Sequence, residues 1–365
     1  MKYSIIVPVF NRPDEVDELL QSLCSQKLKD FEVIIVEDGS TIPCKDVCDK
    51  YANILDLHYY YKENSGPGQS RNYGAERAKG DWLIVLDSDV VLPEEYLEAV
   101  NAHLQNQGEK VTTPLSPERG VGGEAAFGGP DASHPSFTSV QKAISYSMTS
   151  FFTTGGIRGG KGKKLDKFFP RSYNMGIRRE VYQELGGFSK MRFGEDIDFS
   201  YRIVEAGYKT ALIPEAWVWH KRRTDFRKFF RQVYNSGIAR INLEKRHPGT
   251  LKLVHLLPTV FTVGVIGLLM LFLCGLALFF FSPDHMSAAF GFAVCELSLI
   301  PIILYSILLF LDSSIRNLNP WVGLLSIPAA FTQLMGYGLG FIESWWKRCI
   351  LKQDEFTAFE KNFYK

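Results

Sequence analysis

The chain has 365 residues, of which 46% are hydrophobic and 13% aromatic. This is enough for a substantial core in two domains, or in one domain with an appendage, and it excludes a disordered chain. The net charge is +1, and the six cysteines support neither a disulfide framework nor a zinc site, because no second Cys or His pair has ligand spacing. We therefore expect reduced thiols in the cytoplasm, and the N-terminus has no signal-peptide pattern.

Residues 1–218 have the pattern of a soluble α/β domain, in which short β-branched apolar runs alternate with amphipathic helices. The pattern predicts strands over 4–9, 31–36 and 83–86 and helices over 14–26, 70–78 and from about 195. Runs that are apolar on both faces and joined by helices predict a parallel sheet covered by helices. Ligands of such sheets collect at the carboxyl ends of the strands.

Acidic residues follow two of these strands. Asp87 and Asp89 come directly after the run 83–86, and residues i and i+2 of an extended chain point to the same side. Two carboxylates so close repel each other, and Mg²⁺ or Mn²⁺ is the simplest stabilising partner, with substrate phosphates completing its shell. The second group, Glu37-Asp38-Gly39-Ser40, can reach the same cleft, although an Asp-Gly turn is the structural alternative.

Two further segments carry candidate chemistry. In Glu63–Asn72 the glycines permit close backbone approach, and Arg71 near the start of a helix can meet a phosphate. No Walker pattern occurs, which excludes a P-loop. Further along, Glu195, Asp196 and Asp198 open a predicted helix. They are either partners of the helix dipole or include a general base for an attacking hydroxyl.

The stretch 117–164 is rich in glycine, with four Gly-Gly pairs, and carries several basic residues. We expect a mobile lid that orders over substrate here. An inert loop is the alternative.

The composition changes after residue 218. The stretch Trp219–Lys252 has ten Lys or Arg against two acids, and phenylalanines lie between the basic residues of 221–231. This predicts an amphipathic helix on anionic lipid headgroups or a grip on a lipid diphosphate. Nucleic acid can use a similar patch, but the apolar stretches that follow favour lipid.

Three apolar stretches, 258–281, 288–311 and 321–342, are each long enough to cross a hydrocarbon core of roughly 30 Å. Three crossings place Lys347, Arg348 and Lys352 outside, against the positive-inside rule. Alternatively the third stretch, which contains Pro328 and several glycines, lies in the interface or re-enters. Glu296 is costly in lipid, and we expect it to face a helix or a polar cavity.

Taken in order, several short motifs resemble the inverting glycosyltransferases of family 2, of a membrane-anchored bacterial type. The likeness covers roughly residues 3–240. The motifs are Pro8–Asn11, Glu37–Ser40, Gly68–Asn72, Asp87–Asp89, Asn174–Arg179 and Gly194–Asp196. The resemblance implies a GT-A fold, which is a Rossmann-like nucleotide-diphospho-sugar transferase domain, followed here by C-terminal transmembrane helices.

The resemblance also implies roles for individual residues. A nucleotide-sugar donor, with a UDP-sugar favoured, is expected to contact Pro8, Val9, Asn11, Glu37, Asp38, Arg71, Asp87 and Gly176. Mg²⁺ or Mn²⁺ is expected at Asp87, Asp89 and His220. Asp196 is the expected general base, with Glu195 beside it as a second catalytic residue.

Two departures refine the expectation. Glu37 stands where the family has the first Asp of Asp-Asp-Gly-Ser, and the Gln-x-x-Arg-Trp motif of processive synthases is absent, since residues 232–236 read Gln-Val-Tyr-Asn-Ser. We therefore expect transfer of one sugar per acceptor. An inactive GT-A-like membrane scaffold and a sugar nucleotidyltransferase remain the alternatives.

The expected organisation has four parts. These are a cytoplasmic catalytic domain (1–218), a basic juxtamembrane segment (219–257), a membrane region (258–342) and a charged tail (343–365). The expected location is the cytoplasmic face of a bacterial inner membrane. The expected partners are membrane lipids and a lipid-linked or glycan acceptor, with no nucleic acid.

Overall fold

The computed structural model describes residues 2–108, 124–134, 136–155 and 168–359. The chain divides into two compact units, which are treated separately below. The first unit contains Met1–Pro135 and Lys164–Lys221, and the second contains Ser136–Lys163 and Arg222–Lys365. The expected catalytic domain, 1–218, differs from the first unit because the segment 136–163 groups with the second.

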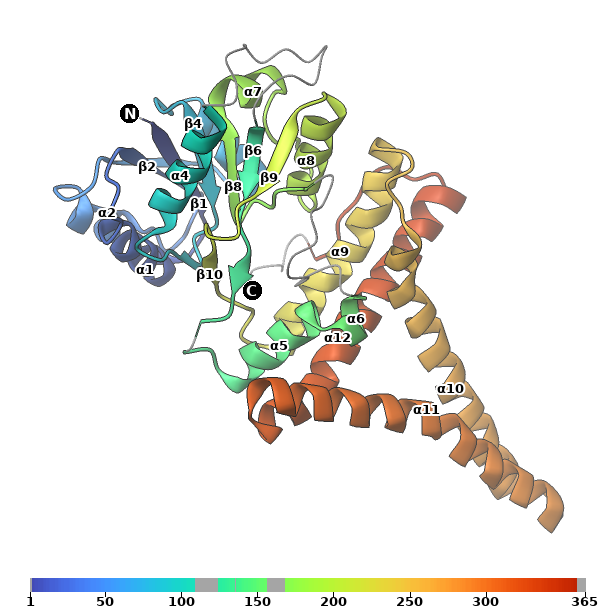
Figure 1. Cartoon of the computed structure of the whole chain (residues 1–365). Coiled ribbons are helices and arrows are strands. Elements are labelled where there is room, and N and C mark those ends of the chain that lie inside the picture. The colour runs from blue at the N-terminus through green and yellow to red at the C-terminus, as the bar shows by residue number, and fades with distance from the viewer. Residues whose placement is uncertain (1, 109–123, 135, 156–167, 360–365) are drawn as a thin grey trace. The chain divides into compact units, whose positions relative to one another are not determined.

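A seven-stranded sheet in the order β3-β2-β1-β4-β8-β6-β9 forms the centre of the first unit (Figure 1). The strands are β1 (Tyr3–Val9), β2 (Phe31–Asp38), β3 (Leu57–Lys62), β4 (Trp82–Leu86), β6 (Glu124–Gly128), β8 (Asn174–Arg178) and β9 (Lys209–Leu212). Strands β1 to β4 are parallel, as predicted, and β8 runs antiparallel to both β4 and β6. The mixed α/β sheet confirms the expected fold class.

Helices cover both faces of this sheet. They are α1 (Pro13–Cys24), α2 (Lys45–Tyr51), α3 (Pro67–Ala75), α4 (Tyr96–Gly108), α7 (Arg179–Glu184) and α8 (Glu195–Glu205). Successive residues of β1 enter different cores: Ile5 packs in a cluster with Leu19 of α1, and Ile6 in a cluster with Phe199 of α8. This alternation follows from the pleat of a strand, and it explains why β1 is apolar on both faces.

A second, three-stranded sheet has the order β5-β10-β7. Its strands are β5 (Val90–Val91), β7 (Asp131–Ala132) and β10 (Val218–His220). Strand β10 is antiparallel to β5, with His220 opposite Val90, and parallel to β7, with Val218 opposite Asp131. This small sheet therefore brings His220 next to the turn that follows β4.

The described part of the glycine-rich stretch forms helices and strands, and the lid stays a prediction. Residues 124–155 form β6, β7, α5 (Ser139–Thr149) and α6 (Phe151–Thr154), whereas 117–123, 135 and 156–164 lie outside the described residues. At Gly129 a Cβ would come within 1.7 Å of the Ala216 carbonyl oxygen. Glycine is needed there for close backbone packing rather than for mobility.

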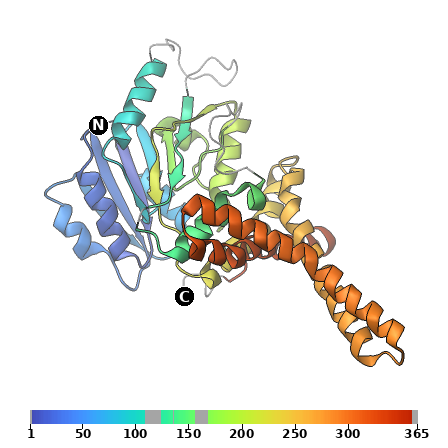
Figure 2. The same cartoon turned by 60° about the horizontal axis from the view of Figure 1, so that its bottom comes forward.

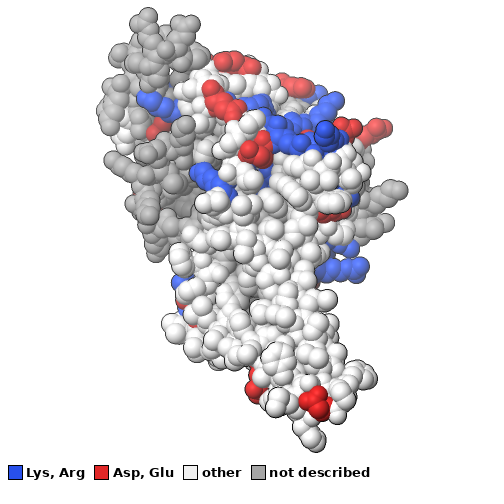
Figure 3. Space-filling view, turned by 90° about the vertical axis from the view of Figure 1, so that its right-hand side faces the viewer, with Lys and Arg blue, Asp and Glu red and all other residues white. Residues whose placement is uncertain are grey.

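The second unit is built mainly from the helices α9 (Phe226–Arg246), α10 (Leu257–Phe281), α11 (His285–Asn317) and α12 (Pro320–Trp345). Helices α10 and α11 run side by side to a shared tip in both views (Figures 1 and 2), and most of the hairpin surface in Figure 3 carries no charge. Among the described residues, three helical stretches are long and apolar enough to span a membrane, namely Leu253–Phe281, His285–Asn317 and Pro320–Ile350. The three predicted apolar stretches are confirmed as helices.

Two expectations about these helices need correction. Helix α12 continues through Pro328, so the third stretch is not broken there. Glu296 is exposed on α11, so within the described chain it does not face a helix or a cavity as expected. Asp312 and Glu343 differ from it, because they accept hydrogen bonds from Tyr146 (2.7 Å) and Tyr234 (2.5 Å).

The predicted amphipathic helix forms as α9, but its apolar side packs against protein instead of lipid. Phe229 and Val233 are buried in a cluster with residues of α5 and α12, while Arg227 and Lys228 are exposed. At Gly340 of α12 a Cβ would come within 2.0 Å of the Tyr234 carbonyl oxygen. The glycines that suggested a broken helix instead let two helix backbones touch.

We predict that Gly340→Ala lowers the free energy of unfolding by about 1–3 kcal/mol, because overpacking forces α9 and α12 apart. Thermal unfolding of the full chain in detergent measures the change. Gly264→Ala is the matched control, since a Cβ at that position of α10 meets nothing within 4 Å. An equal loss of unfolding free energy in the two variants would show that Gly340 is not needed for the close approach of α9 and α12.

Candidate functional site at the carboxyl edge of the sheet

The loops after β1 and β2 are bonded to each other at the carboxyl edge of the sheet. Asn11 adopts a positive φ of 55°, and its Oδ1 accepts hydrogen bonds from the backbone N–H groups of Thr41 (2.8 Å) and Ile42 (2.9 Å). Pro8 is half-buried and Val9 buried at the end of β1. Asn11, in the loop after β1, therefore fixes the position of the loop after β2.

Glu37 is fully buried, and both of its carboxylate oxygens are bonded within the protein. One oxygen accepts from the Ser40 hydroxyl, and the other accepts from the Cys44 N–H (2.7 Å) and the Tyr59 hydroxyl (3.3 Å). The side chain shapes the loop after β2.

Asp38 holds the loop that precedes α3 in place. Its carboxylate accepts from the N–H groups of Ser65 and Gly66, both at 2.9 Å, and pairs with Lys62 at the end of β3. The two acids at the end of β2 therefore accept hydrogen bonds from protein donors, and Asp38 fixes the path of the glycine-containing loop that precedes α3.

The structure brings the three expected metal ligands together. The ligand atoms of Asp87, Asp89 and His220 all lie within 4.8 Å of one another, and His220 Nε2 is 3.3 Å from Asp89 Oδ1. Two carboxylates and an imidazole form a donor set that suits Mn²⁺ and related divalent ions. The donor chemistry of these residues fits a bound cation.

Neighbouring residues fix the orientation of the His220 ring. Tyr173 stacks on it with ring centroids 4.9 Å apart, and His220 Nδ1 lies 3.8 Å from Asp131 Oδ2. Asp131 therefore lies near the ring nitrogen that is opposite Nε2, the nitrogen that faces Asp89. Neither Tyr173 nor Asp131 was expected from the sequence.

Arginines are the positive partners of the paired acids. The Arg71 side chain is 4% exposed and bridges Asp87 Oδ1 and Glu195 Oε1, each at 2.8 Å. Arg12, the residue before α1, lies 3.0 Å from Asp89 Oδ2. Arg71 thus joins the turn after β4 to the first residue of α8.

The two acids at the start of α8 have opposite pKa shifts. Burial would raise the pKa of Asp196, but its ion pair with Arg171, at 2.6 Å, outweighs burial and holds the pKa below its usual value. Burial raises the pKa of Glu195 to about 7 against the opposing charge of Arg71. Adjacent carboxylates with pKa values pushed apart are typical of acid–base sites.

Not every expected residue reaches this cluster. Gly176 lies opposite Ile84 inside the sheet, where a Cβ would come within 2.0 Å of the Phe127 ring, so its glycine serves packing. Asp198 pairs with Arg202 of its own helix at 3.1 Å.

Sequence reasoning missed three cations of the site, Arg12, Lys62 and Arg171. Arg12 could have been found from the sequence. It directly follows the motif residue Asn11, and the paired acids need a positive partner near the same edge of the sheet. Arg171 has no such signal, since it lies between the described strands β6 and β8 and reaches Asp196 only through the fold.

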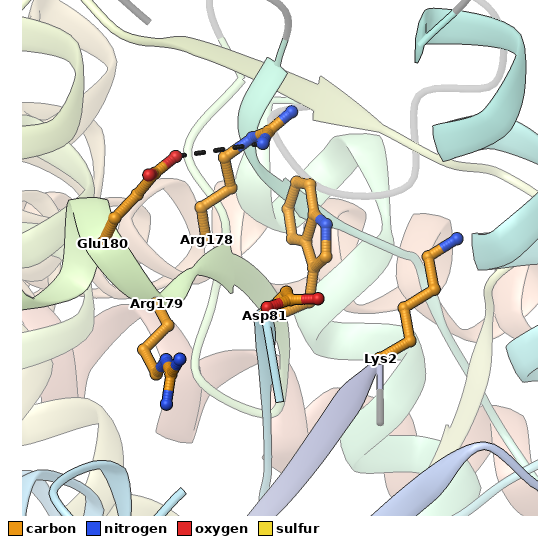
Figure 4. A pocket seen from close by; sticks show the side chains of 6 residues that line it. Lys2, Asp81, Arg178, Arg179 and Glu180 are labelled. Carbon is orange, nitrogen blue, oxygen red and sulfur yellow. Dashed lines mark ion pairs between the residues drawn. The ribbon is translucent and has the colours of Figure 1, made fainter. Parts of the chain in front are cut away.

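The described chain also has a pocket at the opposite edge of the sheet, where β1 and β4 begin (Figure 4). It is lined by Lys2, Asp81, Trp82, Arg178, Arg179 and Glu180. The Arg178 guanidinium lies over the Trp82 ring at 5.1 Å and pairs with Glu180 at 3.8 Å. None of the expected site residues lines this pocket.

A comparison with models of protein families finds a match that covers half of the chain. The model of "Glycosyl transferase family 2" matches residues 4–186. A pre-mycofactocin glycosyltransferase of Mycobacterium tuberculosis is 27% identical over 251 residues, which are 67% of this chain and 48% of that protein. The poly(ribitol-phosphate) β-N-acetylglucosaminyltransferase TarS of Staphylococcus aureus is 35% identical over 127 residues, 34% of this chain and 22% of that protein.

This chain therefore spans about half of the first relative and about a fifth of the second. Among solved structures, the mannosyltransferase PcManGT from Pyrobaculum calidifontis, in complex with GDP-Man and Mn²⁺, superposes with a TM-score of 0.52 at 14% identity. The superposition covers 95% of this chain and 88% of that one. It shows a shared fold.

We predict that Arg71→Leu destabilises the first unit, because it leaves the buried Glu195 and the half-buried Asp87 without their common positive partner. Breaking a buried ion pair from one side costs about 3–5 kcal/mol, and we expect the lower end because Asp87 is 31% exposed. Chemical denaturation measures the loss. Lys45→Met, which breaks an exposed pair with Asp49, is the control, and a similar loss there would contradict the prediction.

Proposed function

This chain belongs to glycosyltransferase family 2, and from that premise we propose that it transfers one sugar from a nucleotide-sugar donor to a hydroxyl of a membrane-associated acceptor, with inversion. The observation that carries the proposal is the network at the carboxyl edge, in which Arg71 links Asp87 of the metal set to Glu195 beside Asp196. Groups for binding a diphosphate and for activating a hydroxyl thus belong to one network.

The donor is proposed to bind at the loops after β1, β2 and β4. Asn11 and Glu37 support this by holding the loops after β1 and β2 in place, and Asp38 holds the loop that precedes α3. PcManGT, which shares the fold, is described with GDP-Man and Mn²⁺, and this supports a nucleotide sugar as the donor class. We propose a UDP-sugar as the first candidate.

Asp87, Asp89 and His220 would hold Mg²⁺ or Mn²⁺, and such an ion stabilises the negative charge that develops on a departing diphosphate. Arg12 and Arg71 balance the charge of the two carboxylates and keep them in place. Tyr173 stacks on the His220 ring, whose Nε2 lies 3.3 Å from Asp89 Oδ1.

Asp196 is the proposed general base. Because Arg171 keeps its pKa low, Asp196 is ionised at neutral pH and ready to accept the proton of the acceptor hydroxyl. Attack by that hydroxyl on the face of the anomeric carbon opposite the leaving diphosphate is a single displacement, which inverts the configuration. Glu195 is the alternative base.

We propose a lipid-linked acceptor at the cytoplasmic face of a bacterial inner membrane. Three helices that fit membrane spans and the exposed Arg227 and Lys228 of α9 support an acceptor with an anionic, lipid-borne group. The absence of the processive Gln-x-x-Arg-Trp motif at 232–236 supports one transfer per acceptor.

Donor use tests the proposal. Full-length protein in detergent is incubated with a panel of nucleotide sugars and Mn²⁺, and release of nucleoside diphosphate is measured. We expect release from one donor, and we expect Asp89→Ala to abolish metal-dependent donor binding, with Asp49→Ala, an exposed acid, as the control. No release from folded protein would favour a scaffold, and pyrophosphate release from a nucleoside triphosphate and a sugar phosphate would favour a nucleotidyltransferase.

The identity of the base predicts the pH profile. With Asp196 as base, kcat/KM should stay level from pH 8 to about 6, because a carboxyl with a lowered pKa remains ionised there. Asp196→Asn should keep donor binding and lose roughly 10²–10⁴-fold in turnover. A tenfold fall in kcat/KM per pH unit below about 7, abolished in Glu195→Gln, would instead assign the role to Glu195.

A further inference from the structure

Three metal-ligating side chains meet at the edge of the sheet opposite the candidate site, where β2 and β3 begin. Glu32 is the second residue of β2, Asp56 directly precedes β3, and His58 is the second residue of β3. Their ligand atoms lie within 4.8 Å of one another. The parallel register, with Ile34 opposite His58, brings them together.

Glu32 is fully buried, yet only one of its oxygens is satisfied by hydrogen bonds. Oε1 accepts from the Ser4 hydroxyl (2.7 Å) and from the Lys79 N–H (2.6 Å). Oε2 accepts no hydrogen bond from the described part of the chain, and the Lys79 ammonium is 4.0 Å away. Because a buried carboxylate oxygen without a donor is costly, Oε2 requires a cationic partner.

His58 has the spacing of a ligand that shares a metal with the two acids. Its Nε2 lies 3.5 Å from Glu32 Oε2 and 3.1 Å from Asp56 Oδ1, and among the described residues it makes no hydrogen bond. Two ligand atoms of a tetrahedral zinc site are about 3.3 Å apart, given metal–ligand distances of roughly 2.0–2.1 Å.

A direct imidazole–carboxylate hydrogen bond elsewhere in the chain has a different geometry. His103 Nε2 and Glu124 Oε2 are 2.6 Å apart, much closer than either separation at His58. The longer separations at His58 leave space for an ion between the three ligand atoms.

We propose that Glu32, Asp56 and His58 bind one Zn²⁺, with water as the fourth ligand. One nitrogen and two carboxylate oxygens suit zinc, and Asp56 and His58 are 45% and 30% exposed, so the fourth position is open to solvent. Lys79 is 63% exposed, and its ammonium turns toward water when the ion binds. Cysteine spacing could not reveal this site, because its ligands are two carboxylates and a histidine that the start of β2 and the start of β3 bring together.

The zinc ties the edge strand β3 to β2. It is independent of the proposed transferase function, because none of its ligands belongs to the catalytic edge. We expect zinc added to metal-free full-length protein to raise the thermal unfolding midpoint by several degrees, since a ligand that binds only the folded state stabilises it.

Metal content and spectroscopy test the site. Asp56→Asn and His58→Ala should each lose one zinc per chain by elemental analysis, together with the visible absorption of a cobalt-substituted tetrahedral site. His103→Ala, the matched control, should lose neither. Asp89→Ala must keep the His58-dependent zinc, because Asp87, Asp89 and His220 can also take up metal.

The proposal is overturned if zinc leaves the unfolding midpoint of the wild-type chain unchanged, or if His58→Ala binds as much zinc as the wild type and the His103→Ala control do. The first result would mean that His58 is only an ion-pair partner of the two acids. Asp56 is exposed, so loss of zinc in Asp56→Asn with unchanged circular dichroism separates loss of a ligand from misfolding.

Discussion

The candidate site depends on the neutralisation of buried carboxylates by arginines. Glu195 and Asp196 are each less than a tenth exposed, and a buried charge is costly unless it is paired and hydrogen-bonded. Arg71 and Arg171 supply that pairing. Because Arg71 also holds Asp87, which lies in a different loop, the same guanidinium sets the position of α8 relative to the end of β4. The chemistry of the site and the packing of the unit therefore share one set of contacts.

What the sequence predicts well is local. A buried apolar run that ends in acids marks the carboxyl end of a strand, and this located the turns after β2 and β4. The pairing of each arginine with its acid was not predictable, because the contacts Arg12–Asp89 and Arg71–Glu195 join residues 77 and 124 positions apart. His220 was expected only through a family resemblance, and what places it is the pairing of β10 with β5. Sequence patterns specify elements, whereas these ion pairs arise from topology.

The same limit applies to the helices of the second unit. Hydropathy predicted three long apolar helices, because length and composition are local properties. It could not tell whether an apolar side meets lipid or another helix, and α9 buries Phe229 against protein. Gly338 suggested a break in the third apolar stretch, but it lies where α12 contacts α10. A Cβ at this position would come within 2.2 Å of the Thr262 hydroxyl oxygen. Small residues at close helix crossings serve packing in this way.

The acidic residues at the end of β2 hold the loops around them in place through bonds within the protein. Asp38 already accepts hydrogen bonds from Ser65 and Gly66 and pairs with Lys62 of the edge strand β3. A loop held in this way loses little conformational freedom when a ligand binds, so more of the contact energy appears as affinity. Strand β3 is therefore more than the border of the sheet. Its carboxyl end supplies Lys62, which pairs with Asp38 and so connects the edge of the sheet to the loop that precedes α3.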